Sequence, residues 1–163
     1  MAQNKTNKFE ADILRLIFNG TTIANIADNA ATSPATEIYV ALFTASPNEQ
    51  ASFASEATYT GYARVGVARD NGQWVVTEST DTAGGITGVT ETTGGAVVQN
   101  ASTITFGACI AGSETITHVG ICKSLSGTTS ADLLYAGALN TSLAVSVGVT
   151  PQFAANALKV YEY

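Results

Sequence analysis

The sequence predicts a mainly β protein, a β-sandwich or jelly roll with a short N-terminal helix or arm. Short segments rich in β-branched and aromatic residues follow one another, and Gly, Pro, Asn and Ser separate them. A helical spacing of apolar residues is convincing in one segment only, close to the N-terminus. No internal repeat is evident, which disfavours a propeller or a solenoid.

The composition of the 163 residues suits one packed domain with few charges. Hydrophobic residues make up 45% and charged residues 12% of the chain, against roughly 25% charged residues in soluble domains. The net charge is −6 and the seven Lys and Arg residues are scattered, so we expect no nucleic-acid partner. No run approaches the roughly 20 apolar residues of a membrane span, and the N-terminus does not read as a signal peptide. We therefore expect no membrane partner and synthesis in a cytoplasm.

The one predicted helix begins at Asn7 and ends at Asn19-Gly20. Asn7 is suited to cap the first turn, with Glu10 three residues later as in a capping box, and glycine is a common stop signal. A helix this short needs a docking partner for its apolar stripe in order to persist. The predicted interface residues are the four apolar residues of that stripe: Phe9, Ile13, Leu16 and Ile17.

Residues 21–36 form a polar connector, so we predict an arm over residues 1–36 and a β-sandwich domain over residues 37–163. Two placements of the arm stay open. In one, the helix covers a face of its own sandwich. In the other it docks on a neighbouring subunit, where a segment that orders on binding can wrap a large surface.

The predicted strands are short and closely spaced. Asp70-Asn71-Gly72 marks a hairpin-like turn between two of them. Residues 78–95 are mostly Thr, Gly, Glu, Asp and Ser, and we interpret them as a loop that contacts a partner. The strands are predicted at residues 37–44, 61–69, 74–76, 96–99, 103–106, 115–123, 133–138, 143–147 and 157–161.

No residue pattern indicates catalysis, so the sequence predicts no catalytic residue and no enzyme. The single histidine, His118, lies in a predicted strand beside valine and isoleucine, and the chain has no Gly-x-Ser-x-Gly elbow. The chain has enough acidic residues for glycoside hydrolysis, but they lie in predicted loops, where carboxylates usually just face solvent. They are Glu56, Glu78, Asp81, Glu91 and Glu114.

No metal or cofactor site is predicted either. The single histidine and the two cysteines, Cys109 and Cys122, lack the spacing of zinc ligands. No glycine pair leads into a Lys-Ser/Thr step or a helix, so there is no phosphate cradle. In a reducing compartment we interpret the cysteines as two buried thiols. A disulfide between neighbouring strands stays open, because sequence spacing does not decide it.

Taken in order, these segments resemble a family of small β-domain virion proteins of tailed bacteriophages. Its members resemble tail-fibre proteins, or the cement and decoration proteins of phage capsids. The resemblance covers nearly the whole chain and contains no catalytic signature. The blocks that carry it are Phe9–Gly20, Ile38–Pro47, Gly61–Arg64, Ile104–Phe106, Ile116–Ile121, Leu133–Leu139 and Phe153–Val160.

The resemblance implies a structural protein of the virion, assembled in the cytoplasm of the bacterial host, without a cofactor. Our first expectation is a capsid cement or decoration protein that stabilises joints of the shell. Its partners are then the major capsid protein and copies of itself. The alternative is a tail or tail-fibre component that binds a host-surface receptor. Under this alternative we expect exposed aromatic residues such as Tyr39, Tyr59 or Tyr62 at a recognition face.

Overall fold

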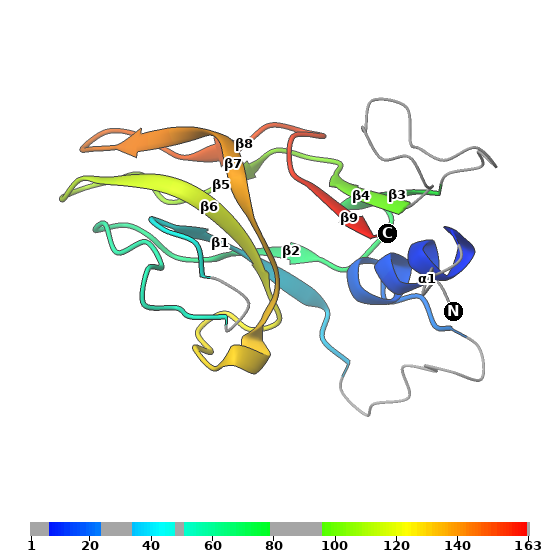
Figure 1. The fold of residues 1–163 in the computed structure, drawn as a ribbon. Helices are drawn as coiled ribbons and strands as arrows, with labels where there is room; N and C mark the ends of the chain where they lie inside the picture. Colours follow the sequence, from blue (N-terminus) through cyan, green and yellow to red (C-terminus); the bar gives the residue numbers. More distant parts are fainter. Residues whose placement is uncertain (1–6, 24–33, 48–50, 79–95, 163) are drawn as a thin grey trace. The chain divides into compact units, whose positions relative to one another are not determined.

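A computed structural model of the chain describes residues 7–23, 34–47, 51–78 and 96–162, and the side chains from residue 9 onward (Figure 1). The described chain forms two compact units. The first unit comprises residues 1–36, 69–102 and 154–163, and the second comprises residues 37–68 and 103–153. Antiparallel sheets dominate both units, and the only α-helix among the described residues is the predicted N-terminal one. The predicted mainly β class is therefore confirmed.

The first unit consists of helix α1 and a three-stranded antiparallel sheet. The helix α1 spans Asn7–Phe18, close to the predicted bounds. The sheet has the strand order β3-β4-β9, and β4 pairs with both neighbours. Its strands are β3 (Trp74–Glu78), β4 (Ala96–Asn100) and β9 (Lys159–Glu162).

The second unit consists of a four-stranded antiparallel sheet and a two-stranded one. The four-stranded sheet has the order β2-β1-β6-β7, and β5 pairs with β8 in the smaller sheet. A short 3-10 helix, η1 (Ser130–Asp132), precedes β7. The strands are β1 (Glu37–Phe43), β2 (Val65–Ala68), β5 (Ile104–Thr105), β6 (Glu114–Cys122), β7 (Leu133–Val145) and β8 (Gln152–Phe153).

Strand β1 is the central element of the second unit. Its residues from Val40 to Phe43 are buried without alternation, so both faces of the strand are covered. One side carries Val40 and Leu42. On the other side Phe43 joins a cluster with Ala41 and Cys122, and its ring lies 5.9 Å from the ring of Phe53. A strand that is buried on both faces needs apolar side chains on both, which explains the uninterrupted apolar run of β1.

Helix α1 packs on its own sheet through one of two apolar faces. Ala11, Leu14 and Phe18 are fully buried, and the ring of Phe18 meets that of Trp74 edge-on at 4.9 Å. Successive helical residues are rotated by about 100°. The predicted stripe of Phe9, Ile13, Leu16 and Ile17 therefore lies on the opposite side, where it is exposed or half-buried.

Arg69 fixes the C-terminal end of α1. Its guanidinium donates hydrogen bonds of 2.6 Å to the carbonyl oxygens of Leu16, Ile17 and Ala35. Two of these are carbonyls that a helix end leaves without an intrahelical partner, and a cation there also opposes the helix dipole. Gly20 follows with a φ of +64°, the left-handed conformation that commonly ends a helix.

Asn100 connects segments of the first unit that are far apart in sequence. Its side chain is buried and donates to the carbonyl oxygens of Ser102 and Ala154, at 2.7 and 2.8 Å. Its amide oxygen accepts a 2.9 Å hydrogen bond from the backbone N–H of Leu158. A fully satisfied buried amide of this kind holds the C-terminal segment beside β4.

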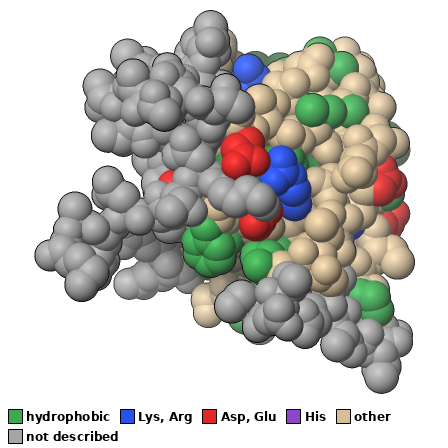
Figure 2. Space-filling view, turned by 90° about the vertical axis from the view of Figure 1, so that its right-hand side faces the viewer, with side chains coloured by type: hydrophobic (Ala, Val, Ile, Leu, Met, Phe, Trp, Pro, Cys, Tyr) green, Lys and Arg blue, Asp and Glu red, His purple; other side chains and the backbone are tan. Residues whose placement is uncertain are grey.

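Three charged side chains of the first unit, those of Asp12, Arg15 and Glu78, lie together. Nη1 of Arg15 lies 3.4 Å from carboxylate oxygens of Asp12 and Glu78. On the face drawn in Figure 2, acidic and basic side chains likewise lie next to each other, and most of the described surface carries no charge. The low charge of the sequence is thus also a property of this surface.

Several predicted local features differ in the structure. Asp70 does form a turn, since its carboxylate accepts the N–H groups of Gly72 and Gln73. The flanking strands do not form a hairpin, however, because β2 pairs with β1 and β3 pairs with β4. The two strands predicted at residues 133–138 and 143–147 are one strand, β7, with a register shift against β6. Strand β8 was not predicted.

The predicted division at residue 36 is one of the places where the chain passes between the two units. Residues 69–102 and 154–163, which we placed in the second domain, lie with α1 in the first unit. The reason is pairing over long sequence separations, since β4 bonds to both β3 and β9. The predicted contact loop at residues 78–95 lies outside the described residues apart from Glu78.

The two faces of α1 predict different responses to the same truncation. Replacing Leu14, which is 0% exposed, by Ala should lower the free energy of unfolding by about 2–5 kcal/mol, because it leaves a cavity against the sheet. Leu16→Ala is the matched control and should lower it clearly less. Urea denaturation followed by circular dichroism measures both. Equal losses in the two variants would contradict this packing.

Candidate functional site

The second unit contains a buried ion pair between Glu56 and Arg64. The guanidinium binds the carboxylate at two points, with Nε 2.7 Å from Oε1 and an Nη 2.8 Å from Oε2. The side chains are 16% and 3% exposed. The other Nη of Arg64 donates a 2.8 Å hydrogen bond to the carbonyl oxygen of Ser124. Bidentate, charge-assisted bonds of this kind are among the strong ones in proteins.

Tyr62 extends this ion pair to the central strand. Its hydroxyl donates to Glu56 Oε1 at 2.9 Å and accepts the backbone N–H of Leu42 at 3.1 Å. The Arg64 guanidinium also lies 4.7 Å from the ring centre of Phe53, at a distance suited to a cation–π contact. We call Glu56, Tyr62 and Arg64 the buried polar centre.

Glycine geometry positions the segment that carries Tyr62 and Arg64. Gly61 has a φ of +103°, and a Cβ there would lie 2.2 Å from the carbonyl oxygen of Ala108. A Cβ on Gly107 would lie 2.0 Å from the carbonyl oxygen of Gly61. Neither position has room for a side chain, so the two backbones approach closely only because both residues are glycines. Residues 61–64 lie outside β2, so the strand predicted at 61–69 is shorter in the structure.

The electrostatics of the buried polar centre are those of a structural site. The hydrogen bonds to Glu56 raise the pKa of Arg64 above its ordinary value. Burial raises the pKa of Tyr62, so this phenol stays protonated and keeps donating. Both oxygens of Glu56 accept hydrogen bonds from within the unit. The arrangement therefore fixes the fold and presents no free base or nucleophile.

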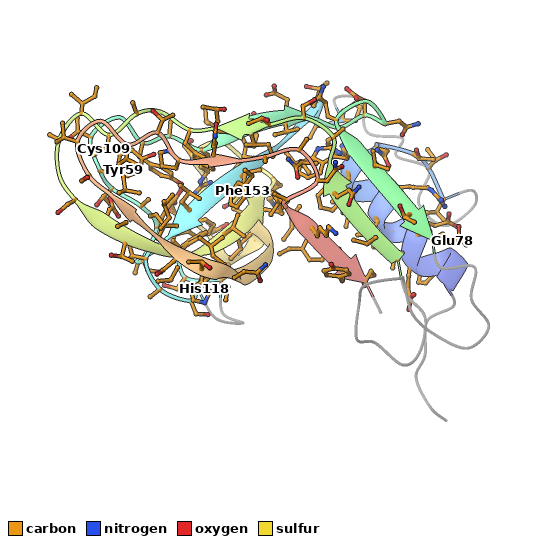
Figure 3. All side chains as sticks on the ribbon, turned by 90° about the horizontal axis from the view of Figure 1, so that it is seen from above. Tyr59, Glu78, Cys109, His118 and Phe153 are labelled. Carbon is orange, nitrogen blue, oxygen red and sulfur yellow. The ribbon has the colours of Figure 1, made fainter. Side chains whose placement is uncertain are left out.

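His118 lies in β6, and in the described part of the chain its ring contacts a threonine and no carboxylate. It is half-buried, and its Nδ1 lies 2.8 Å from Oγ1 of Thr117. The Thr117 hydroxyl donates its only proton to the carbonyl oxygen of Thr44 at 2.9 Å, so it accepts from the histidine ring rather than being activated by it. In Figure 3, His118 is also well separated from Cys109 and Tyr59, which lie together at one end of the second unit.

The acidic residues considered for hydrolysis have structural partners where they are described. Glu56 belongs to the buried polar centre and Glu78 pairs with Arg15. Glu114 accepts the backbone N–H of Thr58 at 2.8 Å. Asp81 and Glu91 lie outside the described residues. Among the residues that the structure describes, no group of three or more His, Cys, Asp or Glu side chains could hold a metal ion.

Both cysteines are free, buried thiols, as the sequence predicted. Burial raises the pKa of Cys122 to about 11, because a thiolate in the core loses its solvation. Cys109 is 2% exposed, with its sulfur near the carbonyl oxygens of Ala111 and Gly112. No disulfide joins the two residues.

The residues proposed for contacts lie in different environments. The predicted interface stripe of α1 is not the face that packs on the sheet, and Phe9 is its most exposed member at 41%. The expected exposed tyrosine face does not form. Tyr59 is 4% exposed and donates to the carbonyl oxygen of Gly107, and Tyr62 belongs to the buried polar centre. Tyr39 is half-buried in β1.

The buried polar centre was the feature that sequence reasoning missed. Gly61–Arg64 was singled out as a block, but its arginine was not paired with Glu56. The sequence did contain a signal for it. Arg64 stands between apolar residues in a chain with few charges, and a buried arginine needs an acidic or hydrogen-bonding partner.

Comparison with known families connects this architecture to phage tails. A family model described as "Podophage GP4 fiber I protein gp80" matches residues 4–161. The chain belongs to this family. No curated protein matches it.

Membership in a phage fibre family makes the chain a structural, virion-associated protein of a bacteriophage. The expected phage origin and the resemblance to tail-fibre-like virion proteins are thereby confirmed. The name of the family favours the tail over the capsid, so it agrees better with the alternative expectation than with the cement protein. No helix within the described residues is long and apolar enough to cross a membrane.

Removing Arg64 should destabilise the protein strongly. In Arg64→Met the Glu56 carboxylate stays largely buried without its cation, and we expect a loss of about 3–5 kcal/mol in the free energy of unfolding. The double variant with Glu56→Gln should recover part of this loss, because no buried charge remains.

Arg15→Met is the matched control, since its ion pairs are longer and its side chain is 31% exposed. We expect it to cost at most about 1 kcal/mol. Urea denaturation of the three variants measures these differences. A cost for Arg64→Met no larger than that for Arg15→Met would contradict the role of the buried polar centre.

The raised pKa of Cys122 predicts a loss of stability at alkaline pH. The ordinary pKa of this thiol is 9.0, and in the folded chain it is about 11. Between these values the unfolded chain releases a proton that the folded chain retains, so the free energy of unfolding should fall as the pH rises. Denaturation curves across this range should show a shallower decline for Cys122→Ala than for the wild type. An unchanged slope would contradict the assignment.

Proposed function

We propose that this chain is a non-catalytic structural component of a phage tail fibre. The observation that carries the proposal is the family match, which spans nearly the whole chain and names a fibre protein. The chain thus corresponds to the family over both of its compact units rather than over a shared fragment.

The chemistry of the described residues supports a role without catalysis. The single histidine is hydrogen-bonded to Thr117, whose hydroxyl proton is donated to a backbone carbonyl oxygen. Glu56, Glu78 and Glu114, the described carboxylates considered for hydrolysis, each bind a group of their own unit. A hydrolase needs a base and a nucleophile or water position within reach of one another. The described chain instead uses these groups to hold segments together.

The fibre role also suits the mechanical construction of the second unit. A fibre transmits load between the particle and the surface it meets, so its parts must keep their shape. The buried polar centre connects the loop segment of Glu56, the central strand and the backbone at Ser124 through charged or hydrogen-bonded contacts. A capsid cement protein would need the same rigidity, but no observation on this chain favours the capsid.

Contact with a host-surface receptor remains part of the proposal at the level of the assembled fibre. The tyrosines first considered for it are not available as a face, because Tyr59 and Tyr62 serve the interior. Any recognition by this chain must therefore use side chains other than Tyr59 and Tyr62.

Location and copy number on purified virions test the proposal. Gold-labelled antibody against the chain should bind at the tail, and quantitative mass spectrometry should find a small copy number per particle. Antibody pre-absorbed with the purified chain is the control. Labelling spread over the head, with a copy number that approaches that of the major capsid protein, would contradict a fibre role and restore the cement interpretation.

A further inference from the structure

The second unit has an open pocket with a largely polar lining. It lies between residues 54–60 and residues 111–114, beside the end of β1, and its volume is about 380 Å³. This volume is within the range of sites that bind small molecules. Hydroxyl groups come from Thr44, Thr58, Thr60 and Ser113, and carboxylates come from Glu56 and Glu114.

Main-chain contacts hold the two walls of this pocket together. The backbone N–H of Thr60 donates to the carbonyl oxygen of Ala111 at 3.0 Å, and the N–H of Ile110 donates to the carbonyl oxygen of Thr60 at 2.8 Å. The Glu114 carboxylate accepts the backbone N–H of Thr58 at 2.8 Å. The pocket is therefore formed before a ligand arrives, and binding pays little for ordering the protein.

The charges of the pocket exclude ionic ligands. None of the described residues that line it is Lys, Arg or His, so a phosphate, sulfate or carboxylate group has no cation to bind. Glu56 is neutralised by its two-point contact with Arg64, and Glu114 is bound by a backbone N–H. One neutralised carboxylate and one other are fewer oxygen ligands than Ca²⁺ or Mg²⁺ takes from such groups.

An apolar ligand fits no better, because it would cover the hydroxyl groups and carboxylates without binding them. The chemistry that complements the lining is a set of hydroxyl groups. Carboxylates accept strong hydrogen bonds from hydroxyl donors, and Thr and Ser hydroxyls both donate and accept. Oε2 of Glu56 accepts one hydrogen bond, from Arg64, and a carboxylate oxygen has room for two. A neutral sugar carries several hydroxyl groups on one small, rigid ring and can meet these groups together.

We propose that this pocket binds a neutral hexose unit through its hydroxyl groups, with Thr58, Ser113 and Glu114 among the groups that contact it. The inference rests on the proposed function for the source of the ligand, because a fibre meets the host surface, where polysaccharides carry such units. An open, polar site of this size binds weakly, with a dissociation constant on the order of 1 mM. Several copies in one fibre raise the overall avidity without any new contact.

Titration of the isotope-labelled full chain with neutral sugars, followed by nuclear magnetic resonance, tests the inference. The probes are the methyl glycosides of glucose, galactose and mannose, each up to about 20 mM. At least one of them should shift the backbone amide signals of Thr58, Thr60 and Gly112 in a saturable way. Calcium chloride and sodium phosphate at the same concentration should leave these signals unmoved.

Two substitutions locate the binding in the pocket. Ala111→Trp should fill the pocket and abolish the saturable shifts, since Ala111 is exposed and lines it. Thr58→Val removes one hydroxyl from an exposed residue and keeps its shape, so it should weaken binding about two- to tenfold.

Ala144→Trp is the matched control for the pocket-filling variant. Ala144 is an exposed alanine of β7 that does not line the pocket. Its neighbour Val145 stands opposite Glu114, so the side chain of Ala144 is on the other face of the sheet. This variant should bind the sugar like the wild type.

Three results would overturn the inference: no saturable shift with any of the sugars, a response to calcium or phosphate alone, or unchanged binding in a folded Ala111→Trp variant. Thermal melting shows whether that variant is folded, and Thr58→Val decides the question if it is not. None of these results bears on the fibre role, which antibody labelling tests separately. Labelling of the head would contradict the fibre role and leave sugar binding by the pocket intact.

Discussion

The bidentate contact between Glu56 and Arg64 is the interaction on which the second unit depends. Taking two charges out of water is costly, and the cost is offset only when each donor and acceptor is satisfied. Here Tyr62, the carbonyl of Ser124 and the ring of Phe53 complete the environment. Because Tyr62 also binds the backbone of Leu42, the ion pair is tied to β1, the strand that is buried on both faces.

The same use of scarce charge is found in the first unit. Arg64 precedes β2 and Arg69 follows it, and each guanidinium binds backbone carbonyls that would otherwise lack a partner. Only 12% of the residues are charged, and several of these make contacts within the protein. The consequence is a surface on which long stretches, β7 among them, carry no charge at all.

Local signals made part of the fold predictable. The spacing of apolar residues and Gly20 located α1, and the run from Glu37 to Phe43 located the central strand. The apolar residues of α1 cover two faces, and periodicity alone did not say which would pack on the sheet. The predicted stripe is the other face, while Ala11, Leu14 and Phe18 are buried. Strands β4 and β9 pair although residues 103–153 of the second unit separate them in sequence. No local sequence pattern predicts such a pairing.

The candidate site was harder to predict, because its residues become meaningful only in three dimensions. Gly61–Arg64 reads as an alternating strand in sequence, yet Gly61 has a positive φ, the segment lies outside β2, and Arg64 binds Glu56. The prediction that the chain is no enzyme rests on residue types alone. The choice between head and tail was not, since sandwich-like β units serve in both places and their physics is the same.

The most direct test of the account is a reconstruction of the intact virion by electron cryomicroscopy at side-chain resolution. The account predicts density for this chain in a tail fibre, with Arg64 enclosed by Glu56 and Tyr62. Density on the capsid shell, with Arg64 turned outward to solvent, would contradict it.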